Sequence, residues 1–212
     1  PNVIIRRASA KTLNLIGSKK ALPNLVEAFR TDSDPVVQGS SAGAMATIGE
    51  PAIDHLLQIL VEPSCTAFQV GLINLALSFI GSKAPDAFDQ ATQSDNVEIR
   101  IAAITVLAEQ IQSQTNKSAK NTLIKAFSDQ ASEVRAEAAT MAGKTLEPEE
   151  ACNHLCKMLK DESDQVRKNT SLALMKMEAK DAIGKIQDAI KAEKDEQVKS
   201  VMKVAVNVLK KS

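Results

Sequence analysis

The sequence predicts an all-α fold in which helix pairs stack one on the next as an α-solenoid. The dipeptide Ile-Gly recurs three times at intervals of 32 residues, at positions 16–17, 48–49 and 80–81. Within each interval the apolar residues follow the helical period of 3.6 in two successive segments, and no segment alternates with period two. Repeats of this length are typical of stacked units that bury their apolar faces only against their neighbours.

The apolar periodicity divides each repeat into a first helix and a second helix. First helices are expected at residues 21–31, 52–62, 84–94, 118–129, 148–161 and 179–193. Second helices are expected at residues 3–16, 35–48, 65–80, 97–112, 132–146, 164–177 and 196–211. A basic residue after a branched apolar residue marks most second helices, at Ile5-Arg6, Ile99-Arg100, Val134-Arg135, Val166-Arg167 and Val198-Lys199.

Residue types at the predicted helix ends are those that cap helices. Oxygen-bearing side chains that accept hydrogen bonds from free backbone N–H groups stand at three starts, which are Asp95, Ser132 and Asp164. Glycines suited to a left-handed C-cap follow three ends, which are Gly17, Gly49 and Gly81, and Pro35 suits a first turn. We expect one repeat domain over residues 1–212 that opens on an unpaired second helix, and a sequence cut short on its N-terminal side.

Composition excludes several classes of partner. The 26 Lys and Arg cancel the 26 Asp and Glu, and the chain has no Trp or Tyr and only five Phe. Without a basic field or stacking platforms we expect no nucleic-acid partner. The longest charge-free run, residues 63–82, contains several polar side chains and opens on proline, so we expect no membrane span. An odd number of cysteines, three, favours a reducing compartment, and hence the cytoplasm.

One motif resembles a known family. The pattern Asp-x-x-Val-Arg-x-x-Ala-Ala is read from Asp95 to Ala103, with one extra residue, and again around Val134-Arg135. It resembles the HEAT-like repeat of cyanobacterial phycobilin lyases, which implies an α-solenoid of about six HEAT-like helix pairs. The stretch from Thr66 to Gly81, followed by Ala84-Pro85, resembles the corresponding helix of two-subunit lyases and lyase chaperones that act on phycoerythrin or phycocyanin.

The resemblance implies a subunit or chaperone that assists thioether attachment of a bilin, an open-chain tetrapyrrole, to a cysteine of a phycobiliprotein. The implied partners are a phycobiliprotein subunit and a second HEAT-repeat lyase subunit in a heterodimer. The implied ligand is a transiently held bilin, with no tightly bound cofactor. Leu75 stands where the family pattern leads us to expect an aromatic residue, which favours a chaperone-like role over catalysis. The alternative is a non-catalytic HEAT adaptor for protein binding, including phycobilisome disassembly.

Charge is missing from part of the expected inner wall, which the second helices build. Residues 35–48, 65–80 and 101–108 contain no charged side chain, whereas the later second helices contain several. Either tight curvature buries these faces, with Gly39, Gly43 and Gly71 allowing close approach, or the wall binds a partner helix or an apolar planar ligand. The candidate contacts of this wall are Gln38, Gly39, Gly43, Phe68, Gln69, Gly71, Asn74, Leu75, Ser78, Phe79 and Thr105.

The repeated arginine has a structural explanation. The resemblance to HEAT-like repeats implies that it pairs with acids of the turns, drawn from Asp32 or Asp34, Asp95, Asp129, Asp161 or Asp164, and Asp195. Gln38 and Val70 replace the arginine in two successive repeats, within the same part of the chain that lacks charge. Gln38, Gln69 and Asn74 are therefore the expected polar contacts of the wall.

The cysteines point only weakly to chemistry. Cys152 and Cys156 share one helical face with Leu155 and Leu159, whereas His154 points about 200° away, so a core stripe is favoured over a metal site. Cys65 is a weak catalytic candidate, because a thiolate at a helix N-terminus could hold a bilin transiently. The alternative for Cys65 is a small buried or cap-adjacent residue.

Overall fold

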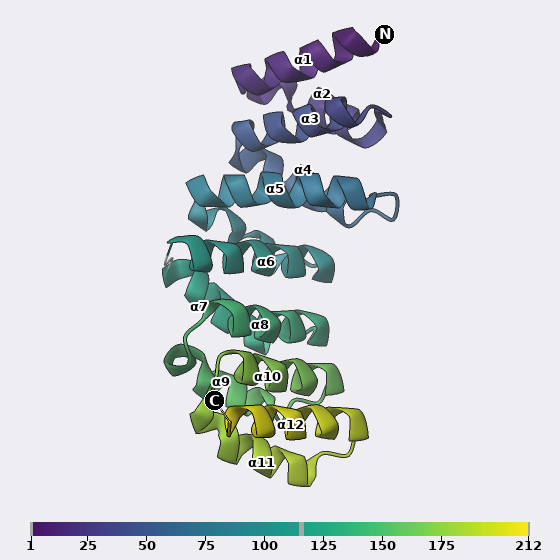
Figure 1. The fold of residues 1–212 in the computed structure, drawn as a ribbon. Coiled ribbons are helices and arrows are strands. Elements are labelled where there is room, and N and C mark those ends of the chain that lie inside the picture. The colour runs from purple at the N-terminus through teal and green to yellow at the C-terminus, as the bar shows by residue number, and fades with distance from the viewer. Residues whose placement is uncertain (1, 115–116, 212) are drawn as a thin grey trace. The chain divides into compact units, whose positions relative to one another are not determined.

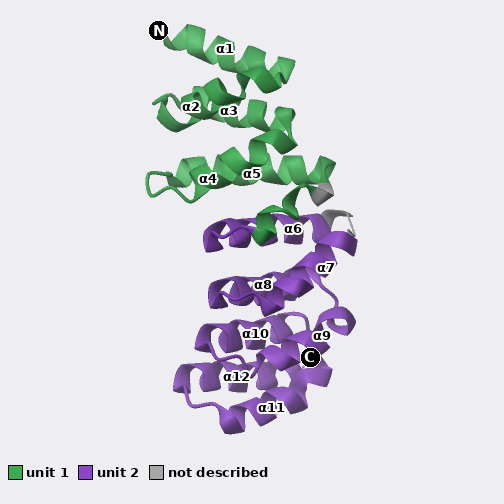
Figure 2. Ribbon diagram, turned by 180° about the vertical axis from the view of Figure 1, so that it is seen from behind, with its two compact units in different colours: residues 1–93 green, residues 94–212 purple. Residues whose placement is uncertain are grey.

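The structure, a computed structural model, describes residues 2–114 and 117–211, and the predicted all-α fold is confirmed within these ranges. They contain helices α1 to α12, joined in places by short 3₁₀ segments, and no β-strand (Figure 1). The chain divides into two compact units, residues 1–93 and 94–212 (Figure 2). The single domain expected over residues 1–212 stays a prediction beside this division.

Unit 1 contains five helices, α1 (Val3–Ile16), α2 (Leu22–Thr31), α3 (Pro35–Ile48), α4 (Ile53–Leu60) and α5 (Ala67–Lys83). The second helices α1, α3 and α5 pack in succession, and α2 and α4 pack against α3 and α5 respectively. The 3₁₀ segments Lys19–Ala21 and Glu50–Ala52 lead directly into α2 and α4. Large apolar side chains fill the space between the two layers, among them Leu25, Phe29, Met45, Leu56, Ile73 and Leu77.

Unit 2 contains seven helices, α6 (Val97–Gln114), α7 (Lys117–Lys125), α8 (Ser132–Thr145), α9 (Pro148–Met158), α10 (Asp164–Lys176), α11 (Ile183–Ala192) and α12 (Glu196–Leu209). The second helices α6, α8, α10 and α12 pack in succession, and α7, α9 and α11 lie against them as a second layer. The contact between α8 and α10 is the most extensive of these.

The helix predicted over residues 84–94 is wrong. This segment forms only two 3₁₀ turns, Pro85–Phe88 and Ala91–Gln93. Ala84 precedes a proline, which disfavours helical backbone, and its ψ of 75° ends α5. Of the described side chains in the segment, only Phe88, Ala91 and Thr92 are buried, so it has too small an apolar face to stabilise a full helix.

The predicted N-caps are displaced by one residue in three places. Asn96, not Asp95, caps α6, because its side chain accepts hydrogen bonds from the N–H groups of Glu98 and Ile99. Ser132 and Asp164 are the first helical residues of α8 and α10, and the residues before them make no side-chain cap. Helix boundaries shift this easily where several polar residues adjoin.

Gly17 and Gly49 are C-caps at the predicted positions, but only Gly17 is left-handed as predicted. Gly17 ends α1 with φ 61° and ψ 27°, whereas Gly49 ends α3 with φ 85° and ψ −140°, outside the left-handed helical region. Gly81 is wrong as a cap, because it lies inside α5, which continues to Lys83. Pro35 is confirmed as the first residue of α3.

Among the described residues, every helix is too short or too polar to cross a membrane.

Candidate binding surface

Helix α5 has two apolar faces, and only one of them is packed. Ile73, Ala76, Leu77 and Ile80 are buried in unit 1. On the opposite side Phe68, Leu75 and Phe79 are 50%, 71% and 43% exposed, at spacings of seven and four residues that place them on one stripe. Surface helices normally turn charged or polar side chains to water, so the exposed stripe is a candidate binding surface.

We call this stripe, with the neighbouring outward residues of α5, the unit 1 wall; it comprises Phe68, Gly71, Asn74, Leu75, Ser78 and Phe79. Asn74 is exposed and Ser78 is half-buried, so both are polar groups within the wall. Gly39 of α3 adjoins it, since a Cβ there would lie 3.9 Å from Leu72 of α5. Thr105 belongs to α6 in unit 2 and lies outside this wall, half-buried, with its hydroxyl donating to the Ile101 carbonyl oxygen.

The start of α5 is tightly anchored. Thr66 and Gln69 form a capping box, in which each side chain accepts a hydrogen bond from the other residue's backbone N–H. The Gln69 amide also donates to the carbonyl oxygen of Phe29 in α2, at 3.0 Å. Gln69 is only 5% exposed, so the prediction that it is a polar contact of the wall is wrong. Its role is to fix the position of α5, and with it the neighbouring Phe68.

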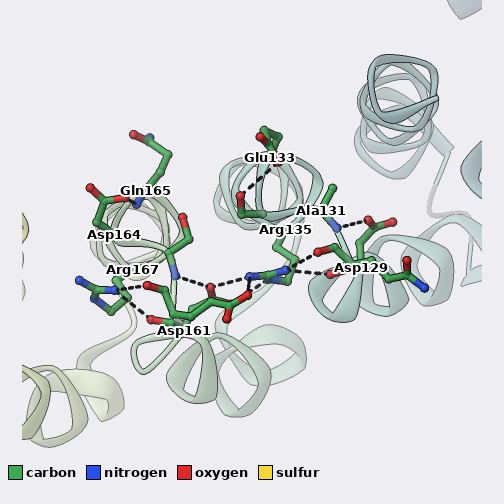
Figure 3. Close-up of polar contacts among 12 residues, drawn as sticks. Asp129, Ala131, Glu133, Arg135, Asp161, Asp164, Gln165 and Arg167 are labelled. Atoms are coloured by element: carbon green, nitrogen blue, oxygen red, sulfur yellow. Dashed lines mark hydrogen bonds and ion pairs between the residues drawn. The ribbon is translucent and has the colours of Figure 1, made fainter. Parts of the chain in front are cut away.

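The arginines expected to pair with turn acids do so in both units. Paired hydrogen bonds join Arg6 to Asp32, Arg100 to Asp129, Arg135 to Asp161 and Arg167 to Glu193; Figure 3 shows the Arg135–Asp161 pair. Such two-pronged contacts are the stronger kind of ion pair. The hydrogen bonds from Arg167 hold the pKa of Glu193 at about 2.

Three of the aspartates predicted to pair with these arginines do not form side-chain ion pairs with them. Asp195 caps α12 through the N–H groups of Gln197 and Val198, and Glu193 takes its place as the partner of Arg167. Asp95 offers Arg100 only its backbone carbonyl oxygen. Asp164 accepts from the N–H of Gln165 rather than from an arginine.

Gln38 keeps one half of the arginine's role. Its amide donates to the carbonyl oxygen of Asp32, six residues earlier, at 2.8 Å. In unit 2 the Nη1 groups of Arg135 and Arg167 each make the same bond to a carbonyl oxygen six residues earlier. Gln38 therefore reproduces the contact to its own turn without adding a charge. Gln38 is half-buried, and its side-chain amide is used in this bond. The fold alone therefore explains a glutamine at this position, and no binding partner is needed.

Three glycines were predicted to allow close approach of neighbouring helices, and the structure supports this role for one of them. A Cβ at Gly43 would lie 3.0 Å from Nδ2 of Asn14 in α1, which is tighter than ordinary contact. A Cβ at Gly39 would make an ordinary contact, and one at Gly71 would meet nothing within 4 Å. Packing of α1 against α3 thus accounts for Gly43, but it leaves the stripe on α5 exposed.

Lys83 is not among the predicted contacts, because the predicted helix ends at residue 80. Lys83 is the last residue of α5 and the one charged residue in that helix. Its Nζ lies 4.1 Å from the centroid of the Phe79 ring, a cation–π contact between residues four apart. The spacing of four residues between Phe79, a predicted wall residue, and Lys83 could have indicated this contact in the sequence.

Cys65 does not have the environment expected of a reactive thiol. Thr66 is the N-cap of α5, so Cys65 lies outside the helix rather than in its first turn. Burial, together with the negative charge of Glu62, raises the pKa of its thiol. The expected stabilisation of a thiolate at this position is therefore wrong.

Cys152 and Cys156 share one face of α9, as predicted, with their sulfurs 3.7 Å apart. Burial raises the pKa of the Cys156 thiol to about 12. His154 points elsewhere, and its ring lies 6.3 Å from that of Phe127. Among the described residues, no group of three or more His, Cys, Asp or Glu side chains could hold a metal ion.

Comparison with known proteins adds to this geometry. A family model described as HEAT repeats matches residues 1–66, 84–176 and 122–207. The chain is 63% identical over 210 residues to the bilin biosynthesis protein MpeU of Synechococcus sp. (strain WH8020), covering 99% of this chain and 71% of that protein.

Solved structures share the fold at low sequence identity. Human deoxyhypusine hydroxylase matches with a TM-score of 0.51 at 16% identity, covering 100% of this chain and 81% of that one. A designed armadillo repeat protein in complex with the peptide (KR)4 matches with a TM-score of 0.50 at 18% identity, covering 91% and 100% respectively. At these identities the likeness concerns the fold alone.

Proposed function

This chain belongs to the HEAT-repeat family, with a bilin biosynthesis protein among its relatives, and we propose that it assists attachment of a bilin to a phycobiliprotein. The observation that carries the proposal is the 63% identity to that relative over nearly the whole chain. The acceptor is a cysteine of a phycobiliprotein subunit, and a second HEAT-repeat chain is the proposed companion subunit.

The chemistry proposed for the complex is a thiol addition. The acceptor thiol adds across a carbon–carbon double bond at the edge of the bilin, so that a sulfur–carbon bond forms and the thiol proton passes to the adjacent carbon. The reaction needs no oxidant. The role of this chain is to hold a reactant against the unit 1 wall, away from water, rather than to supply the nucleophile. The raised pKa of Cys65 supports this chaperone-like role.

The wall suits such a task because its large exposed side chains are apolar and belong to a firmly anchored helix. Phe68, Leu75 and Phe79 stand on one stripe of a helix that the capping box and the Gln69–Phe29 bond hold in place. The three cysteines are free thiols, which supports the cytoplasm as the place of action. Neither nucleic acid nor a membrane is among the proposed partners.

Coexpression tests the proposal. The full chain is produced with a bilin pathway, a candidate companion subunit and individual phycobiliprotein subunits, and bilin on the acceptor is measured by mass spectrometry. We expect attachment to rise when the chain is present. Leu75→Glu should abolish most of that increase, whereas Leu172→Glu, at a position 38% exposed in α10, should preserve it. Equal attachment with and without the chain, for every acceptor and companion, would contradict the proposal.

A second function is favoured by the same exposed stripe. An apolar stripe on one helix also fits an amphipathic helix of a protein partner, as in a plain HEAT adaptor or a phycobilisome-disassembly factor. A chain that binds phycobiliprotein in a pulldown, yet leaves attachment unchanged, would favour this adaptor.

A further inference from the structure

We propose that Lys83 and Phe79 form an anchor for the bilin itself, with the ammonium group binding a bilin carboxylate and the ring covering the adjoining pyrrole rings. This inference rests on the proposed function and names the ligand of the unit 1 wall. The alternative occupant, a partner helix, becomes an outcome of the test.

The position of the charge supports the proposal. Lys83 is exposed, and the contact with the Phe79 ring holds its Nζ beside the exposed stripe rather than leaving it free in solvent. Among the residues whose side chains the structure describes, none forms an ion pair with Lys83. Lys83 thus places a cation beside a wall whose own residues carry no charge, where it can bind an anion.

The length of the stripe also suits the ligand. Phe68 and Phe79 are eleven residues apart, which corresponds to about 16 Å along an α-helix. This distance is long enough to lie along several linked rings of an open-chain tetrapyrrole. Leu72, half-buried, and Leu75 lie between the two phenylalanines on the same face, so the apolar contact is continuous.

The chemistry of a bilin matches this arrangement of groups. A bilin combines a flat, conjugated and largely apolar framework with two propionate side chains on its middle rings. A carboxylate bound at Lys83 would therefore lay the rings of one half of the molecule over Phe79 and Leu75. An amphipathic protein helix would use the apolar stripe but has no fixed need of a cation at its end.

Binding of biliverdin to the purified full chain tests the anchor, with biliverdin dimethyl ester as the uncharged probe. Binding is followed by induced circular dichroism of the bilin at visible wavelengths. We expect Lys83→Gln to weaken biliverdin binding roughly fivefold, in the range of an exposed ion pair. Lys83→Arg should retain it. The matched control is Lys144→Gln, at an exposed lysine in the last turn of α8, which should leave binding unchanged.

The ester separates charge recognition from apolar contact. It should bind the wild-type chain and the Lys83→Gln variant equally, whereas Phe79→Ala should weaken both probes. The proposal is overturned if biliverdin does not bind, if Lys83→Gln binds it like the wild type, or if the ester binds the wild type as tightly as the acid.

The two proposals fail separately. Biliverdin binding that depends on Lys83, without any effect on attachment in coexpression, would refute the proposed function and leave the anchor standing. Assisted attachment by a chain that binds no biliverdin would refute the anchor, and would indicate that the wall holds a protein partner.

Discussion

Gly143 of α8 lies so close to Ala173 of α10 that a Cβ at position 143 would stand 2.7 Å from the Ala173 Cα and 2.8 Å from its Cβ. The obstructing atoms belong to the backbone and the first side-chain carbon, which cannot rotate away. The two second helices can therefore pack at this distance only because residue 143 lacks a side chain.

Gly143→Ala should consequently lower the free energy of unfolding by about 1–3 kcal/mol, the usual cost of overpacking a well-packed core. Thermal unfolding followed by circular dichroism at 222 nm measures the effect. Gly71→Ala is the matched control, because a Cβ there meets nothing within 4 Å and alanine favours helix over glycine by up to about 1 kcal/mol. An unchanged melting temperature for Gly143→Ala would show that α8 and α10 pack less closely.

Gln69 and Asn74, both first expected to bind a partner, should behave differently when each is replaced by leucine. Gln69→Leu should reduce the free energy of unfolding by about 1–3 kcal/mol, because it leaves the Phe29 carbonyl oxygen and the Thr66 N–H without their bonds. Asn74→Leu should leave stability almost unchanged, since Asn74 is exposed. Urea unfolding compares the two, and equal stabilities would argue against the structural role of Gln69.

Acid should destabilise the protein partly through Glu193. Its pKa is about 2 in the folded chain, below its ordinary 4.5, so the unfolded chain takes up the proton first as the pH falls. The contribution to stability is therefore present above about pH 4.5 and is lost as the pH falls toward 2.

Arg167→Met should flatten this part of the dependence of unfolding free energy on pH, because the hydrogen bonds from Arg167 are the main cause of the lowered pKa. Lys144→Met is the control, since Lys144 is exposed and no described residue forms an ion pair with it. If unfolding free energy depended on pH in the same way in Arg167→Met and in the wild type, Arg167 would not be the cause of the lowered Glu193 pKa.

Thiol alkylation should find both Cys65 and Cys156 slow. Burial raises the pKa of each thiol, so the reactive thiolate is scarcer at pH 8 than in a free thiol. Variants that keep one cysteine each, treated with iodoacetamide, give the individual rates. Glu62→Gln should speed the reaction of Cys65, because it removes a negative charge that disfavours the thiolate. A Cys65 faster than glutathione would restore it as a candidate nucleophile.

Local chemistry was enough to place the repeats and several helix ends. Helices α1 and α3 begin and end at the predicted residues, because Pro35, Gly17 and Gly49 act through their own backbone preferences. The arginine–acid pairs were predicted in kind from the resemblance to HEAT-like repeats. The same resemblance, carried by the motif Asp-x-x-Val-Arg-x-x-Ala-Ala, predicted the HEAT-repeat family that the family model confirms.

Tertiary structure decided which polar and apolar groups are free. Gln69 and Asn74 both carry side-chain amides on α5, but the fold buries Gln69 in unit 1, where it bonds to the Phe29 carbonyl oxygen, and leaves Asn74 in solvent. Glu193 rather than Asp195 meets Arg167, because the first hydrogen bonds of α12 occupy the aspartate. Such choices depend on where neighbouring elements lie, which no local pattern records.

Some features of the unit 1 wall come from the sequence alone, and others come from the tertiary structure. The absence of charge from residues 65–80, and the spacing of Phe68, Leu75 and Phe79, are properties of the sequence alone. The continuation of α5 past Gly81, which brings Lys83 over the Phe79 ring, is a property of the folded helix. A helical period predicts which side chains share a face, but only packing of the neighbouring helices determines which face is covered and which remains open to a ligand.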